Sequence, residues 1–206
     1  MALDSPLATP TPTPVPGALH SVQLFDQPES LASTVAAYFL EGWQAGDTLL
    51  AVATAAHWAA IRDRLTAAGV PVAHAIASGR LIVRDARETL DAMRRHERLD
   101  PVRFHGTIGQ LVRALVARGP RVRIFGEMVD LLAAAGRFGC AEQLETWWNG
   151  LAARRPFTLL CGYSAVTFGD PLSVDALRRI CQAHQRVHAD PDDLLGSFLV
   201  TRAGQS

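Results

Sequence analysis

The sequence predicts an α/β protein, built as a three-layer sandwich with helices on both faces of a mostly parallel central sheet. Short apolar runs alternate along the chain with longer segments in which apolar residues recur at helical spacing, a pattern typical of parallel sheets. Residues 48–53 and 157–163 are largely apolar throughout, which indicates strands covered on both faces. The 206 residues, 49% of them hydrophobic, suit one domain with a sizeable core.

The first half of the chain reads as strand-helix units whose ends carry local signals. Thr54 can cap a helix, Gly46 and Gly69 can end one, and the Asp100-Pro101 pair breaks another. The elements expected here are a strand at 20–25, a helix from Asp26 or Ser30 to Gly46, a strand at 48–53, a helix at 55–68, a strand at 81–83 and a helix at 85–98.

The second half continues the alternation. The expected elements are a helix at 104–118, a strand at 122–125, helices at 129–135 and 140–154, a strand at 157–163, a helix at 174–187 and an edge strand at 197–200. Residues 1–18 are rich in alternating proline and threonine, so we expect a disordered arm there and one domain over residues 19–206.

The charge and cysteine content of the chain exclude several classes of partner and of catalytic chemistry. Acidic and basic residues balance at 20 each, so no nucleic-acid surface is expected. Every basic residue is arginine, and the lack of lysine rules out a Walker-type phosphate lysine, a Schiff-base lysine and a Ser-Lys dyad. The three separated cysteines fit reduced thiols. Without a signal peptide or an apolar run of about 18 residues, the expectation is a cytoplasmic protein without membrane contact.

The carboxylate of Glu127 directly follows the expected strand at 122–125. Open α/β sheets bind ligands at the carboxyl ends of their strands, so this position predicts a ligand contact. The same position also suits the start of the following helix, where a negative charge interacts favourably with the helix dipole. The sequence leaves both interpretations open.

Other side chains supply weaker candidates. His105 precedes a helix that leads to the central strand, and it could reach a ligand near Glu127 or simply begin the helix. Trp147 and Trp148 cannot both point inward, because adjacent helical residues are about 100° apart. One of them is therefore expected to face a cleft, a partner or solvent.

A metal helix is considered and set aside. Cys181, His184 and His188 would share one face if all three lay on one helix. Three ligands on one helix rarely converge, and Gln185 replaces the glutamate that a metalloprotease helix needs after its first histidine. We expect solvated or partly packed histidines and no metal.

Two enzyme signatures are incomplete. Ser164 lies between Gly162 and Val166, so the second glycine of a G-x-S-x-G nucleophile elbow is missing. The exits of the first two strands, residues 26–29 and 54–57, lack the glycines of a phosphate-binding loop. The sequence thus predicts no catalytic residues and no cofactor.

Several linked segments resemble the MEDS domain, a sensory domain of prokaryotic signalling proteins named for methanogens, methylotrophs and the dichloromethane regulator. The resemblance covers residues 20–188, and no single segment carries it alone. The segments that carry it are residues 20–26, 39–42, 45–47, 79–81, 123–129, 144–149 and 159–163.

The resemblance implies a RecA- and KaiC-like fold that has lost its phosphate-binding loop. It also implies sensing of a small organic or hydrocarbon-derived ligand, coupled to a histidine kinase, a transcription regulator or a sigma-factor switch. The residues expected to line or support the pocket on this basis are His20, Glu41, Glu127, Glu145, Asn149 and Tyr163, to which the residue patterns add His105 and Trp148.

The leading hypothesis is therefore a non-enzymatic sensory domain with its pocket at the carboxyl edge of the sheet. A second hypothesis is an interaction module, acting as a homodimer through Trp147 or Trp148. A third is a degenerate RecA-like enzyme that retains nucleotide chemistry without a standard loop.

Overall fold

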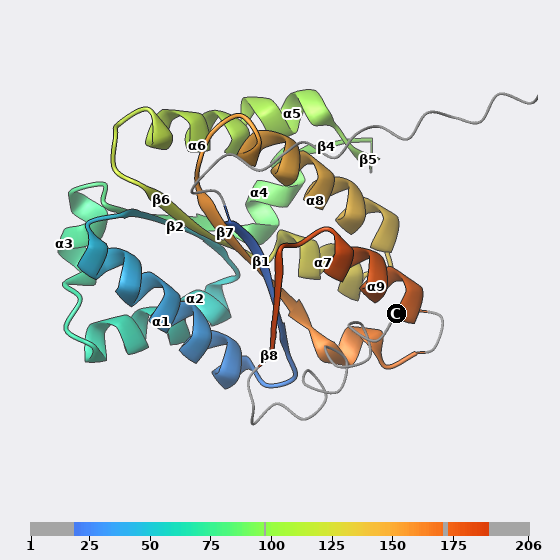
Figure 1. Ribbon diagram of the computed structural model, residues 1–206, viewed down its shortest axis with the longest axis horizontal. Coiled ribbons are helices and arrows are strands. Elements are labelled where there is room, and N and C mark those ends of the chain that lie inside the picture. Colours follow the sequence, from blue (N-terminus) through green and yellow to red (C-terminus); the bar gives the residue numbers. More distant parts are fainter. Residues whose placement is uncertain (1–18, 97, 171–172, 190–206) are drawn as a thin grey trace, which may run out of the picture.

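The computed structural model describes residues 19–96, 98–170 and 173–189 (Figure 1). Its centre is a six-stranded sheet in the order β3-β2-β6-β7-β1-β8, in which every neighbouring pair is parallel. The strands are β1 (Leu19–Phe25), β2 (Thr48–Ala53), β3 (Leu81–Asp85), β6 (Val122–Gly126), β7 (Thr158–Ser164) and β8 (Arg186–Ala189). A separate antiparallel hairpin pairs β4 (Arg94–Arg95) with β5 (Arg98–Leu99).

Helices cover both faces of the sheet, which confirms the predicted three-layer architecture. One face packs against three helices that follow the first two strands: α1 (Pro28–Ala45), α2 (Ala55–Ala67) and α3 (Val72–Ala77). The other face packs against α4 (Ala86–Ala92), α5 (Pro101–Gly106), α6 (Ile108–Val116), α7 (Met128–Ala134), α8 (Phe138–Ala152) and α9 (Val174–Gln182). Figure 1 shows the two groups on opposite sides of the strands.

The order of the strands brings together neighbours whose following helices go to opposite faces. The chain leaves β1 and β2 towards one face, whereas it leaves β6 and β7 towards the other. Because β2 lies beside β6 and β1 lies beside β7, each of these neighbouring pairs sends its following helices to opposite faces. Such a switch in direction opens a crevice at the sheet edge, where α/β proteins bind ligands.

Three expected elements are wrong in extent. The helix expected at 85–98 ends at Ala92, and the β4-β5 hairpin replaces its last turn. The helix expected at 104–118 is two helices, because Thr107 adopts a non-helical backbone between α5 and α6. The helix expected at 174–187 ends at Gln182, and Val187 lies in β8. The short α3 was not predicted.

Two expectations fall on residues that the structure does not describe: the proline-rich arm at 1–18 and the edge strand at 197–200. The edge position beside β1 is occupied by β8, which pairs Ser21 to Leu24 with Arg186 to Ala189. In the ranges that the structure describes, no helix is both long enough and apolar enough to cross a membrane.

Candidate functional site

Glu127 joins the ends of two neighbouring strands. It follows β6 and is buried, with 2% of its surface exposed. Its Oε1 accepts a hydrogen bond from the backbone N–H of Thr54, and its Oε2 lies 2.5 Å from Nδ1 of His57. Thr54 and His57 begin α2, directly after β2. Within the described part of the chain the side chain makes no capping bond to α7, so Glu127 bridges two strand ends instead of capping its own helix.

The groups around Glu127 have shifted pKa values. The hydrogen bond to Glu127 raises the pKa of His57, although partial burial acts in the opposite direction. Burial raises the pKa of Asp130, one turn into α7, to about 6, although a hydrogen bond from the backbone N–H of Ser164 lowers it. The sheet edge therefore holds an imidazole that favours its charged form beside a carboxyl group whose proton leaves near neutral pH.

A cavity of about 760 Å³ opens beside His57 and Asp130. We call it the edge cavity. It lies at the carboxyl ends of β1 and β7, because Phe25 ends β1 and Ser164 ends β7. Half of its fourteen lining residues are polar and the rest are apolar or glycine: Phe25, Asp26, Pro28, His57, Asp130, Ala133, Ala134, Gly136, Phe138, Ser164, Val166, Thr167, Asp170 and Ser173. Glu127 lies behind this wall, where its carboxylate contacts His57.

A second group of polar side chains is buried under the other end of β1. His20 and the β7 residues Cys161 and Tyr163 point to the same face of the sheet, since side chains alternate along strands and β1 pairs with β7 in register. Glu145 on α8 and His184 after α9 meet them there. We call His20, Glu145, Cys161 and His184 the buried cluster.

The carboxylate of Glu145 is the centre of the buried cluster and is fully inaccessible to solvent. Its Oε1 accepts a hydrogen bond of 2.9 Å from the hydroxyl of Tyr163, and its Oε2 lies 3.2 Å from Nε2 of His20. Burial by itself raises the pKa of Glu145, but His184 and His20 beside it bring that pKa well below its usual range. Burial also raises the pKa of the Cys161 thiol, and the charge of Glu145 raises it further. The two histidines therefore favour the carboxylate form of Glu145 in the buried cluster.

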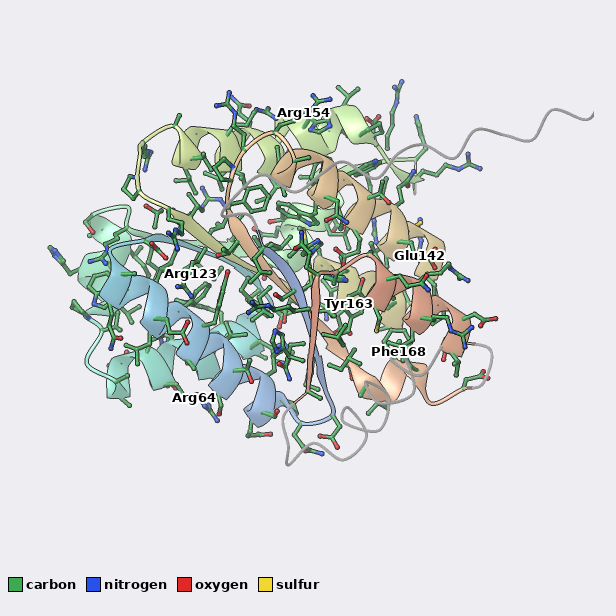
Figure 2. The ribbon with its side chains drawn as sticks, viewed as in Figure 1. Arg64, Arg123, Glu142, Arg154, Tyr163 and Phe168 are labelled. Carbon is green, nitrogen blue, oxygen red and sulfur yellow. The ribbon has the colours of Figure 1, made fainter. Side chains whose placement is uncertain are left out.

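The structure separates the eight predicted site residues. His20, Glu145, Asn149 and Tyr163 come together around the buried cluster, and Figure 2 shows Tyr163 in the interior. Glu127 lies at the edge cavity instead. His20 and Phe25 are five residues apart on β1, roughly 16 Å along the strand, whereas Cys161 and Ser164 are three residues apart on β7, roughly 10 Å.

The remaining predicted residues lie elsewhere. Both indoles lie 5.4 Å from the ring of Phe104, but Trp148 is buried in the core whereas Trp147 is half-buried and lines a cavity, as expected for one of the two. His105 lines a different cavity of about 510 Å³, together with Trp147 and residues that include Arg154, which Figure 2 shows near the upper rim. Glu41 is exposed and pairs with Arg123 at 3.2 Å.

Sequence reasoning missed His57, Asp130 and Cys161 as members of these sites. His57 lies three residues after a helix cap, and only the pairing of β2 with β6 brings it to Glu127. Cys161 stands within an apolar run that reads as core. His184 was considered for a metal together with His188, but α9 ends before either residue and His188 lies on β8.

Comparison with known proteins identifies the family. A search of curated proteins finds no match. A family description does match, over residues 19–185: MEDS, the methanogen/methylotroph, DcmR sensory domain. The matched range includes the six residues Thr54, His57, Glu127, Glu145, Cys161 and His184 and most of the central sheet. The chain therefore belongs to the MEDS family of sensory domains.

Proposed function

We propose that this MEDS domain is a non-enzymatic sensor that binds a small organic molecule in the edge cavity and signals its presence to a partner protein. The observation that carries the proposal is the edge cavity itself, at the crevice between strands whose helices diverge. Its volume of about 760 Å³ falls within the range of small-ligand pockets, roughly 300–1,000 Å³.

The lining favours a ligand with an apolar body and one polar group. Phe25 and Phe138 supply aromatic surface, and the helix residue Ala133 leaves room beside them. His57 offers a ring N–H or a lone pair, and Asp130 offers an acceptor or, when protonated, a donor. A hydrocarbon derivative that carries a hydroxyl, carbonyl or carboxylate group meets these requirements.

Signalling follows if the ligand stabilises one conformation of the sheet edge over another. The edge cavity is formed by residues that follow several different strands, so an occupant contacts elements from both helical layers. The proposed receivers are a histidine kinase, a transcription regulator or a sigma-factor regulator.

Native mass spectrometry of the purified protein, before and after denaturation, tests ligand binding. A released organic molecule at one equivalent supports the proposal. If the protein is free of ligand, short alcohols, aldehydes, carboxylic acids and halogenated alkanes serve as added probes in thermal-shift titrations. A protein that retains no molecule and responds to none of these probes contradicts the proposal.

A matched pair of substitutions locates the binding. Ala134 is exposed and lines the edge cavity, so Ala134→Trp fills the cavity with little damage to the core. The neighbouring Ala135 is also exposed but is outside the lining, so Ala135→Trp adds the same bulk elsewhere. Loss of binding in Ala134→Trp alone supports the edge cavity. Equal binding by both variants moves the site away from it.

Two alternatives are outcomes of the same measurements. A dimer mass without any small molecule favours an interaction module, for which the half-buried Trp147 is the candidate contact. Magnesium-dependent nucleotide turnover that Glu127→Gln abolishes favours a degenerate nucleotide enzyme. Neither alternative predicts that filling the edge cavity removes a bound organic molecule.

A further inference from the structure

The four residues of the buried cluster direct potential metal-ligand atoms towards one point. One nitrogen from each histidine, the Cys161 sulfur and an oxygen of Glu145 all lie within 4.8 Å of one another. The residues come from β1, α8, β7 and the turn after α9, so four separate segments of the fold supply them. All four residues are buried, and the side chains of Glu145 and His184 have no exposed surface.

A hydrogen bond outside the cluster, at Nδ1 of His20, determines the protonation of its inner nitrogen, Nε2. Its Nδ1 lies 2.9 Å from Oδ1 of Asn149, whose amide nitrogen donates to the carbonyl oxygen of Ala183. The Asn149 oxygen is thereby assigned as an acceptor, so Nδ1 of His20 carries the proton. In the neutral ring the lone pair on Nε2 then faces the cluster.

His184 is held in the same way. Its Nδ1 lies 2.7 Å from the carbonyl oxygen of Ile180, which can only accept a hydrogen bond. In the neutral ring its Nε2 therefore also presents a lone pair inward. That Nε2 is enclosed and finds no hydrogen-bond partner among residues 19–96, 98–170 and 173–189. The Oε1 of Glu145 lies 3.4 Å away without the alignment of a hydrogen bond. Histidines whose outer N–H is held by an oxygen are typical of metal ligands.

Three separations, among the inner atoms of His20, Cys161 and Glu145, match those between the ligands of a tetrahedral ion. With zinc bond lengths of about 2.0–2.3 Å, neighbouring ligand atoms lie about 3.3–3.7 Å apart. Nε2 of His20 lies 3.2 Å from Oε2 of Glu145 and 3.3 Å from Sγ of Cys161. Cys161 Sγ lies 3.5 Å from the same Glu145 oxygen.

We propose that His20, Glu145, Cys161 and His184 bind one divalent transition-metal ion, with Zn²⁺ as the best match. Two imidazoles, one thiolate and one carboxylate form a closed four-ligand set of borderline softness, which suits zinc better than magnesium or calcium. The charges of a Cys161 thiolate and the Glu145 carboxylate balance those of the ion. The Cys161 S–H bond breaks as the sulfur–metal bond forms, and the proton leaves to solvent.

The proposed ion has a structural or regulatory role, because all four positions of the site are filled by protein. It ties β1 and β7 to α8 and to the turn that leads into β8. Without an ion, the buried cluster encloses the carboxylate of Glu145 and leaves Nε2 of His184 without a hydrogen-bond partner among the described residues. The metal site is independent of the edge cavity, so failure of either proposal leaves the other intact.

Cobalt(II) is the probe for the test, since it takes zinc sites and its bond to a thiolate gives a charge-transfer absorption band in the near ultraviolet. The full chain, without a histidine tag, is refolded with a chelator and then titrated with cobalt chloride. The chain has three cysteines, so the double variant Cys140→Ala/Cys181→Ala leaves Cys161 as the sole thiol. This variant keeps every proposed ligand.

A thiolate band that saturates at one equivalent in the double variant, and that one equivalent of zinc removes, supports the site. No band in a folded double variant overturns it. Cys161→Ser should lose the band and Glu145→Gln should weaken cobalt binding at least tenfold, with circular dichroism as the check on folding. If Cys161→Ser keeps an unchanged band, Cys161 is not the ligand and the proposal is wrong.

Discussion

Glu127 and His57 lie 70 positions apart in the sequence, yet their side chains meet at a distance of 2.5 Å. The contact exists because β2 and β6 are neighbours in the sheet and each residue follows the end of its own strand. It orients the imidazole that faces the edge cavity. The order of the strands therefore determines where the imidazole of His57 lies.

Replacing Glu127 by glutamine should lower the pKa of His57 towards its ordinary value of about 6.5, because the hydrogen bond with Glu127 is the main cause of its elevation. Two-dimensional NMR of the ring protons, followed from acidic to alkaline pH, measures the change. Glu142→Gln is the control, since that carboxylate pairs with Arg179 on the surface (Figure 2). An unchanged His57 titration in Glu127→Gln would show that the contact does not exist in solution.

Asp130 should make the protein less stable as pH rises through the range of its titration. Burial raises its pKa from about 3.8 to about 6, so the folded state holds its proton more tightly than the unfolded state does. The resulting stability is complete below about pH 4 and is lost between about pH 4 and 6.

In Asp130→Asn the backbone N–H of Ser164 keeps an acceptor, but the titration is gone. The free energy of unfolding of the variant, relative to the wild type, should therefore rise by about 1–3 kcal/mol between pH 4 and pH 7. Urea denaturation at several pH values measures this difference. A constant difference across that range would contradict the elevated pKa.

Asn149→Ala should destabilise the protein by about 2–4 kcal/mol, because it leaves the Nδ1–H of His20 and the carbonyl of Ala183 without their partner. Gln143→Ala, at an exposed position on the same helix, should change stability by less than about 0.5 kcal/mol. Urea denaturation compares the two. Equal effects would mean that the amide does not connect α8 to its neighbours as the structure has it.

Gly42 and Gly150 should respond to alanine with opposite signs. A Cβ at Gly42 would lie 2.6 Å from Cδ of Arg123, whose Nε binds Asp47 at 2.7 Å, so Gly42→Ala should cost about 1–3 kcal/mol. A Cβ at Gly150 would meet no described atom within 4 Å, so Gly150→Ala should gain up to about 1 kcal/mol of helix stability. Thermal denaturation measures the stability of both variants relative to the wild type. Stabilisation by both would show that Arg123 yields without loss of its ion pair.

The sequence predicts those parts of the fold that local patterns determine. The five strands expected within residues 20–163 are present, because continuous apolar runs must be covered on both faces. The break at Thr107 and the pairing of β4 with β5 escaped prediction, since the flanking residues keep helical periodicity. Gly106, directly before Thr107, was the local signal for the break. The strand β8 was not predicted, because Arg186 and Val187 look like the end of a helix.

The sites were harder to predict, since they depend on which strands are neighbours. Glu127 could be found because it follows an obvious strand, whereas His57 becomes significant only once β2 is known to pair with β6. His20, Glu145, Asn149 and Tyr163 were predicted from family resemblance, which does not show that they lie apart from Glu127. Their convergence with Cys161 and His184 is a property of the packed layers.

One strand, β1, has a residue of the buried cluster near its beginning and a residue of the edge-cavity wall at its end, and β7 beside it has Cys161 at its middle and Ser164 at its end. If binding at one site changes the affinity of the other through these two strands, the effect must be reciprocal. If a metal ion in the buried cluster raises the affinity of the edge cavity for its organic molecule tenfold, that molecule must raise the affinity of the cluster for the ion tenfold as well. This factor corresponds to a coupling free energy of about 1.4 kcal/mol. A domain with such coupling would respond fully only when both the metal ion and the organic molecule are present.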